Sequence, residues 1–166
     1  MEPVLVDNKR LAVMPPEGFE PIPHDELETL LGIRYDCLWG MRDTTRHMML
    51  SVTWKDSNKL ITRLVSEKAF AKRVDETFAK RYRKGSYRCE GRFSCTIAGA
   101  SAPAQGFRFS CTIQDVAHNG EVLVFKRGIR CYTLSYYTRS QFAAANRPVY
   151  EEIVASLEVR AEGDAS

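Results

Sequence analysis

Strict alternation of apolar and polar residues between Tyr87 and Ile97 is the feature that most constrains how this chain can fold. The apolar phase consists of Tyr87, Cys89, Gly91, Phe93, Cys95 and Ile97. Successive side chains of a strand point to opposite sides, so these residues are predicted to share one face. The same period recurs in Phe107, Phe109, Cys111 and Ile113. A small-residue loop at 99–104 joins the two runs, which predicts an antiparallel pair contributing both apolar faces to one core.

Further strands are predicted around this pair. His118-Asn119-Gly120 is interpreted as a turn, because Asn-Gly favours tight hairpins, and Gly128 marks the next turn. In chain order, the predicted strands occupy residues 11–14, 33–42, 47–55, 87–97, 107–114, 121–127 and 129–138. The sequence therefore predicts an antiparallel sheet of six or seven strands.

Helices are predicted at residues 24–31, at 65–84 and from 140 to about 157. Gly32 suits the end of the first helix, and Ser66 suits the capping position of the second. Apolar residues recur every four positions along the second helix, at Phe70, Val74, Phe78 and Tyr82. The last helix is predicted to break at 146–147 and to restart at Pro148.

The order of these elements predicts one α+β domain rather than a doubly wound parallel sheet, because strands and helices do not alternate strictly. A chain of 166 residues is the usual length of a single domain. We expect the domain to span residues 1–160 and residues 161–166 to form a flexible C-terminal tail. The expected architecture is a sheet flanked by helices on both faces, an αβα sandwich.

Composition favours a cytoplasmic protein. No export signal is recognised, and no window approaches the ~20 apolar residues that cross a bilayer, so no membrane partner is expected. Five cysteines without a Cys-x-x-Cys pair argue against a zinc or redox centre and predict free thiols. We interpret them as small buried side chains, with a reactive thiol at Cys37 or Cys131 as the alternative.

Several local features together resemble the PsbP/Mog-like (DcrB-like) superfamily, which includes small bacterial proteins of unknown function. The resemblance rests on a Pro-rich opening before Gly18-Phe19, on Gly106-Phe107 opening a strand, on Tyr132-Thr133-Leu134, and on a closing helix over 150–157. It covers most of the chain. It implies an αβα sandwich that works without catalysis, usually by binding a protein partner, and it carries over no catalytic residue and no cofactor.

Catalytic and metal-binding motifs are not recognised in the sequence. The three histidines, His24, His47 and His118, show no ligand spacing with cysteine or carboxylate, so no metal site is predicted. No Gly-x-Ser-x-Gly elbow is present. The glycines around 99–106 lack the Gly-Lys-Ser/Thr ending of a phosphate loop. We therefore predict no catalytic residue and no cofactor, and interpret the protein as a non-enzyme.

A basic run is the most noticeable surface feature. It consists of Lys80, Arg81, Arg83, Lys84 and Arg88, around the end of the predicted long helix. Cations at a helix C-terminus interact favourably with its dipole, so a solvated helix end explains the run without any partner. The alternative is a binding site for an acidic partner, because positive fields steer association.

Three functions follow from these features. The favoured one is a cytoplasmic protein-binding, adaptor or chaperone-like domain with a protein partner of unknown identity; a homodimer stays open. A chaperone would hold an apolar helix on an open sheet face. The second is a small-molecule binder or an enzyme without a recognisable motif. The third is weak nucleic-acid binding by the basic run, which a net charge of only +3 disfavours.

Overall fold

A seven-stranded antiparallel sheet forms the centre of the protein, and the computed structural model describes it within residues 2–161, with backbone only at 61–63. Across the sheet the strands follow the order β3 (Glu20–Pro21), β4 (Leu38–Asp43), β5 (Met48–Asp56), β9 (Arg130–Arg139), β8 (Val116–Arg127), β7 (Ala104–Ile113) and β6 (Arg88–Cys95). The predicted antiparallel sheet of six or seven strands is confirmed. Of the expected tail at 161–166, residues 162–166 lie outside the described part.

A second, three-stranded sheet joins the two ends of the chain. It consists of β1 (Val4–Val6), β2 (Leu11–Val13) and β10 (Glu158–Val159), with β2 in the middle. The strand predicted at 11–14 therefore exists, but it lies at the centre of this small sheet rather than at an edge of the large one. Its three residues are buried, because the small sheet covers part of one face of the large sheet.

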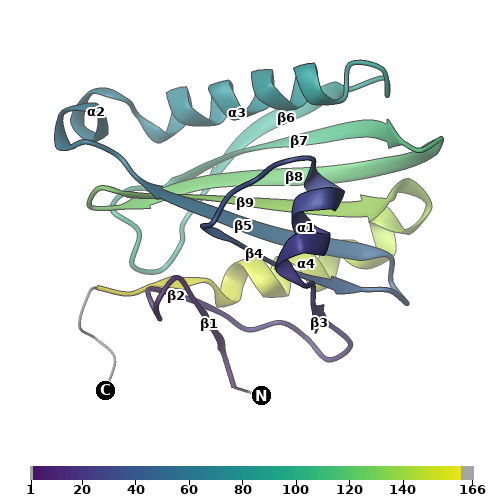
Figure 1. Ribbon diagram of the computed structural model, residues 1–166, viewed down its shortest axis with the longest axis horizontal. Coiled ribbons are helices and arrows are strands. Elements are labelled where there is room, and N and C mark those ends of the chain that lie inside the picture. The colour runs from purple at the N-terminus through teal and green to yellow at the C-terminus, as the bar shows by residue number, and fades with distance from the viewer. Residues whose placement is uncertain (1, 162–166) are drawn as a thin grey trace.

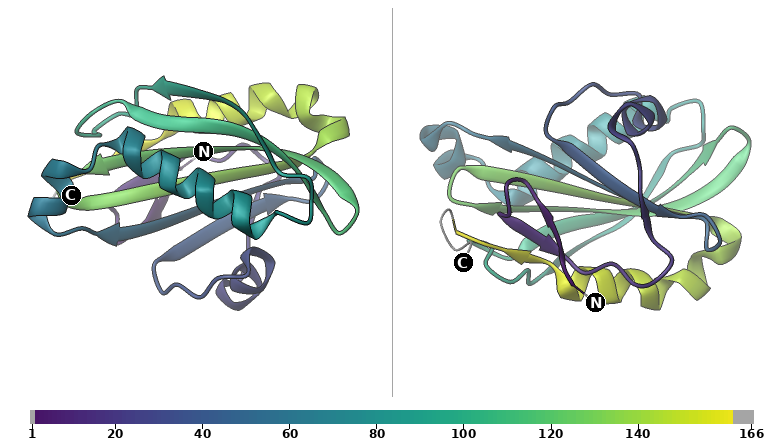
Figure 2. Two further views of the ribbon diagram at one scale, coloured as in Figure 1. Left: turned by 90° about the horizontal axis from the view of Figure 1, so that it is seen from above. Right: turned by 60° about the horizontal axis from the view of Figure 1, so that its bottom comes forward.

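Helices cover both faces of the large sheet (Figures 1 and 2). The helices are α1 (His24–Leu31), α2 (Lys59–Leu64), α3 (Glu67–Arg81) and α4 (Ala143–Ser156), the last preceded by a short 3₁₀ turn, η1 (Ser140–Phe142). One core lies between the sheet, α3 and α1, and the other between the sheet, α4 and the small sheet. The predicted αβα sandwich is confirmed.

Local signals place α1 and α3 as predicted. Gly32 follows α1 with φ +64°, in the left-handed region that glycine favours. Ser66 caps α3, where its Oγ accepts a hydrogen bond from the Ala69 N–H at 3.2 Å. The regular helix ends at Arg81, somewhat before the predicted residue 84.

The predicted break in the last helix is wrong, because α4 runs without interruption through Pro148. Asn146, at the expected break, is buried against the preceding strand. Its Nδ2 donates to the Arg46 carbonyl at 2.7 Å and to the Thr138 Oγ1 at 2.8 Å. These bonds hold the first turns of α4 on the sheet and offset the hydrogen bond that Pro148 cannot donate.

The prediction that Tyr87 to Ile97 share one face is also wrong. The pairing of β6 with β7 shifts by one residue between Cys89 and Gly91, so Glu90 is an extra residue in a β-bulge. One inserted residue reverses which face every later side chain points to. Tyr87 and Cys89 therefore pack beneath α3, whereas Phe93 and the apolar residues after it pack on the α4 side.

The predicted turn at His118-Asn119-Gly120 is wrong as well. The chain turns earlier, at Gln114 and Asp115, whose φ values of +49° and +63° suit a two-residue hairpin. Gly120 lies inside β8, where a Cβ would come within 2.2 Å of the Phe109 ring and 2.5 Å of the Tyr136 carbonyl oxygen. Glycine is needed here for a close approach of side chain and backbone, not for a turn.

Replacing Gly120 with alanine should destabilise the protein by about 1–3 kcal/mol, the usual cost of overpacking a core. Urea unfolding of Gly120→Ala would measure the loss. The atom nearest to the new Cβ belongs to the Phe109 ring. Gly120→Ala should therefore cost less stability in a Phe109→Leu background than in the wild type. Wild-type stability of Gly120→Ala would contradict the close approach.

Candidate functional site

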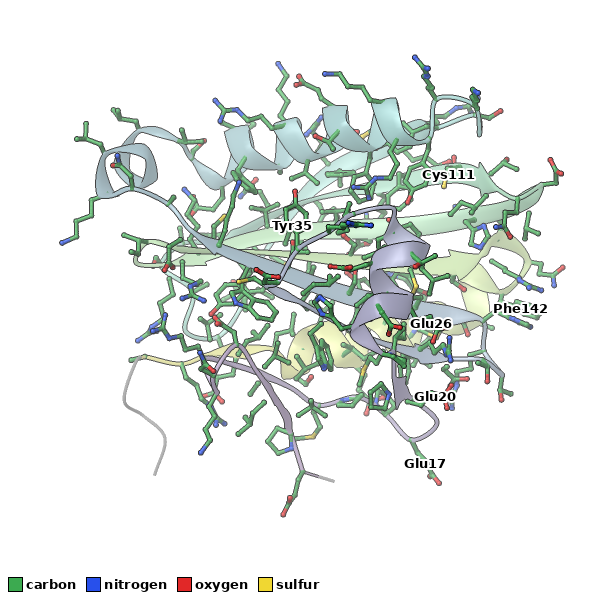
Figure 3. The ribbon with its side chains drawn as sticks, viewed as in Figure 1. Glu17, Glu20, Glu26, Tyr35, Cys111 and Phe142 are labelled. Carbon is green, nitrogen blue, oxygen red and sulfur yellow. The ribbon has the colours of Figure 1, made fainter. Side chains whose placement is uncertain are left out.

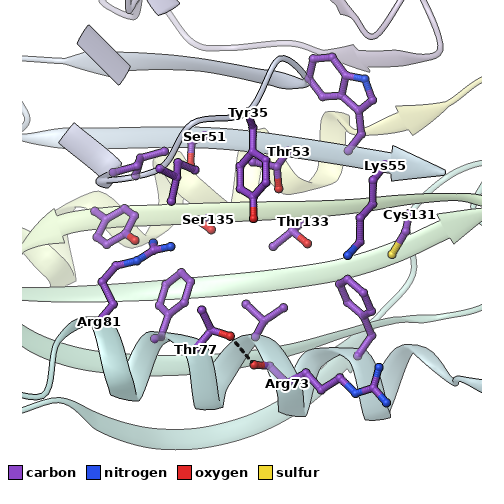
Figure 4. Close-up of a pocket in the computed structure, with 17 residues that line it drawn as sticks. Tyr35, Ser51, Thr53, Lys55, Arg73, Thr77, Arg81, Cys131, Thr133 and Ser135 are labelled. Carbon is purple, nitrogen blue, oxygen red and sulfur yellow. Dashed lines mark hydrogen bonds between the residues drawn. The ribbon is translucent and has the colours of Figure 1, made fainter. Parts of the chain in front are cut away.

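A groove lies on the large sheet between α3 and α1, because these two helices pack over different strands. Helix α3 contacts β7 and β8, and α1 contacts β4. Strands are ~4.8 Å apart and a helix is ~10 Å wide, so one helix covers about two strands. β5 and β9, between the two covered regions, form the floor of a cavity of about 320 Å³. Figure 4 shows this groove with α3 along one side.

Four hydroxyl side chains line the floor of the groove. They form two cross-strand pairs between β5 and β9, Ser51 with Ser135 and Thr53 with Thr133. Ser51 is only 3% exposed and Ser135 only 8%. Within the described residues none of the four hydroxyls has a hydrogen-bond partner. The floor therefore offers unused donors and acceptors to whatever occupies the groove.

The walls of the groove are apolar and its rim is cationic. Phe70, Val74 and Phe78 of α3 form one wall, and Leu31 and Ile33 form part of the other. On that second side Tyr35 points into the groove, although its side chain is 57% exposed (Figures 3 and 4).

Three cations, Lys55, Arg73 and Arg81, are among the lining residues, and no carboxylate is among them. The Lys55 Nζ lies 5.1 Å from the centre of the Phe70 ring, and the Arg81 guanidinium 5.2 Å from that of Phe78. Two of the three cations thus make cation–π contacts with aromatic rings of the α3 wall.

Side-chain contacts near the middle of α3 and just before its first residue hold this wall in place. Near the middle of α3, the buried Asp75 accepts a hydrogen bond from the Tyr87 hydroxyl and pairs with Arg92. Tyr87 directly precedes β6, and Arg92 lies within it. Burial, and then the hydrogen bond to Asp75, raise the pKa of Tyr87 far above its usual value, so this hydroxyl stays a donor. Just before α3, the buried Lys126 donates to the Val65 carbonyl.

The sequence-predicted basic residues do gather at one end of α3. Lys80 and Arg81 lie in its last turn, Arg83 and Lys84 in the turn that follows, and Arg88 begins β6; all five are exposed. Of these residues only Arg81 also lines the groove. The basic helix end, meaning these five residues, therefore adjoins one end of the groove.

The groove itself was missed at the sequence level. A usable signal exists, because Ser51 and Thr53 alternate with apolar residues along β5, as Thr133 and Ser135 do along β9. Hydroxyls in the phase that should face a core indicate that this face is not fully covered. The sequence cannot tell that these two strands are neighbours.

The histidines lie apart in the structure. His24 begins α1 beside Glu28, His47 stacks on Phe142 in the β4–β5 turn, and the His118 Nδ1 lies 2.8 Å from the Val116 carbonyl oxygen. A search of the described residues finds no group of three or more possible metal ligands. Within the described part of the chain, the fold thus brings no set of metal ligands together.

The five cysteines are all free, and two of them are buried. Cys131 lines the groove, and Cys111 lies under α3 (Figure 3). Burial raises the pKa of each of these two thiols to about 11. At neutral pH both stay protonated, which argues against the reactive thiol considered for Cys131, because the thiolate is the nucleophile.

A thiol reagent should separate the cysteines by exposure. At pH 8 the exposed Cys37 should react with DTNB first, and the thiols of Cys111 and Cys131 should react slowly until the protein is denatured. Mass spectrometry of partly labelled protein would assign the sites, and Cys37→Ser should lose the fast phase. Labelling of Cys131 as fast as Cys37 would show that its thiol is not shielded.

Comparison with known proteins relates the chain to others by fold and not by sequence. No protein-family model matches the sequence, and no curated protein is detectably similar to it. Among solved structures, the cyanobacterial PsbP of Synechocystis superposes with a TM-score of 0.69 at 15% identity, over 93% of this chain and 90% of that one. The Ran-binding protein Mog1p of Saccharomyces cerevisiae gives 0.60 at 9%, over 95% and 94%. The chain has the PsbP/Mog-like fold.

A protein of Bacteroides thetaiotaomicron gives a TM-score of 0.63 at 10% identity, over 98% of this chain, which spans half the length of that protein. The named neighbours with the PsbP/Mog-like fold are not described as enzymes, and Mog1p is a protein-binding member. Within the described residues of this chain, no helix combines the length and the apolar character that crossing a bilayer requires.

Proposed function

We propose that this chain is a non-enzymatic binding domain of the cytoplasm, and that the basic helix end docks an acidic segment of another protein. The observation that carries the proposal is an imbalance in ion pairing. Within the described part of the chain, seven arginines elsewhere pair with carboxylates, among them Arg92 with Asp75 and Arg147 with Glu121, whereas Arg34, Arg73, Arg127 and Arg139 do not. The five cations of the basic helix end have no carboxylate partner among the described residues.

The helix dipole explains only part of this arrangement. It favours Lys80 and Arg81 in the last turn of α3, but its effect fades beyond that turn, whereas Arg88 is on a strand. Unpaired charges on a surface contribute little to stability and mainly raise association rates with an oppositely charged partner. The grouping of five such cations is therefore better explained by binding than by folding.

Other features support a protein ligand in a reducing compartment. Five free thiols fit the cytoplasm. The chaperone-like variant requires an open sheet face, yet helices and the small sheet cover both faces and leave a groove of only about 320 Å³. An α-helix is ~10 Å wide with its side chains, so the exposed basic helix end suits a protein partner better.

Charge reversal at the basic helix end tests the proposal. The triple variant Arg83→Glu, Lys84→Glu, Arg88→Glu leaves the groove-lining residues untouched. Its stability should change by about 0.5 kcal/mol or less per site, because the side chains are solvated. In affinity capture from the native cell with quantitative mass spectrometry, a protein retained by the wild type should be lost. With that protein purified, the association rate should fall.

A matched control carries the same charge change elsewhere: Lys9→Glu, Lys59→Glu, Arg139→Glu, all exposed positions. It should retain the partner. If the reversal variant and the wild type capture the partner equally, the basic helix end is a solvated surface and not a binding site. Capture that nuclease treatment abolishes, with a steep salt dependence, would favour nucleic acid instead.

A further inference from the structure

We propose that the groove between α3 and α1 binds a small amphipathic anion, a carboxylate or sulfonate on an aromatic or short aliphatic body. This ligand differs from the protein partner proposed for the basic helix end, and the two surfaces share only Arg81. Three independent properties of the groove support the assignment: its hydroxyl floor, its charge and its size.

The hydroxyl floor indicates a polar occupant. Ser51 and Ser135 are more than nine-tenths buried and have no partner among the described residues, although they line the cavity. Their hydroxyl oxygens are not fully enclosed, because the enclosed side-chain oxygens without a partner among the described residues are those of Tyr136 and Tyr150, so an occupant of the groove can reach them. Together with the half-buried Thr53 and Thr133, they place four hydroxyls side by side on β5 and β9, which can donate to an anionic oxygen that lies across the two strands.

The charge of the lining sets the sign of that occupant. Lys55, Arg73 and Arg81 contribute three positive charges, and no lining residue contributes a negative one. Arg73 and Arg81 are eight residues apart on α3, which is about 12 Å along the helix axis. One anionic group can therefore reach a cation at either end of the groove while the rest of the ligand lies along the aromatic wall.

The walls and the volume set the size and the apolar part. A cavity of about 320 Å³ is at the lower end of the range for small-molecule sites. Phe70, Phe78 and Tyr35 present rings to it, so an aromatic or short aliphatic body is complementary to the walls.

Binding of two fluorescent probes would test the proposal. 8-Anilinonaphthalene-1-sulfonate carries an aromatic body and one anionic group, and N-phenyl-1-naphthylamine is the same body without the sulfonate. The folded wild type should bind the sulfonate at least ~10-fold more tightly than the neutral probe, because charge-assisted hydrogen bonds form only with the anion. Equal affinity for both probes would overturn the anionic assignment.

Variants locate the site. Arg73→Gln with Arg81→Gln should weaken sulfonate binding ~10-fold, and Thr53→Val with Thr133→Val, which replaces hydroxyl by methyl at nearly the same volume, should weaken it severalfold. Lys80→Gln with Arg83→Gln removes the same number of charges near the end of α3 without changing a groove-lining residue, and should have no effect. Thermal unfolding would confirm the fold of each variant. If the valine pair does not fold, Ser51→Ala with Ser135→Ala replaces it.

Amide chemical shifts distinguish this site from any other. Titration of ¹⁵N-labelled wild type with the sulfonate probe should shift the amides of Ser51, Thr53, Thr133 and Ser135 most. Shifts confined to the basic helix end, or wild-type affinity in both groove variants, would overturn the proposal. The reversal variant Arg83→Glu, Lys84→Glu, Arg88→Glu should bind the probe normally, so this proposal and the proposed function can fail separately.

Discussion

The burial of Phe78 between α3 and the sheet decides where the groove lies. Its ring packs edge-on against Phe107 and Phe109, with centroids 5.9 Å and 5.3 Å away, which places α3 over β7 and β8. Aromatic pairs in this geometry contribute about 0.5–1.5 kcal/mol each beyond their area burial. Because α3 is fixed over those strands, it cannot also cover β5 and β9.

Two buried carboxylates reinforce the helix positions, one on each face of the sheet. Asp75 joins α3 to Tyr87 and Arg92 on one face. On the other, Glu121 of β8 pairs with Arg108 at 3.1 Å and with Arg147 of α4 at 2.7 Å. A buried carboxylate deprived of its partners is costly, so each pair fixes an orientation rather than adding much net stability. Helices α3 and α4, on opposite faces of the sheet, are thus held by polar contacts as well as by apolar packing.

The lining of the groove combines hydroxyls, aromatic rings and cations. Its thiol at Cys131 stays protonated because burial raises the pKa, and Tyr137, buried at one end, has its pKa raised well above the usual value for the same reason. The hydroxyls, the aromatic walls and the cations can orient a ligand through hydrogen bonds, ring contacts and charge. The basic helix end adjoins this groove through Arg81 alone, so the two surfaces share one residue and remain otherwise distinct.

Periodicity in the sequence determined most of the secondary structure, because an apolar face must be buried whatever its neighbours are. The stripe of Phe70, Val74 and Phe78 and the cap at Ser66 identified α3, and alternation identified the strands. The basic residues were also visible, since they are close together in sequence. Only the tertiary structure decided the structural roles of Glu90, Gly120 and Pro148, because each role depends on contacts with another element of the fold. It alone decided the groove, because Ser51 and Ser135 become neighbours only through the pairing of β5 with β9.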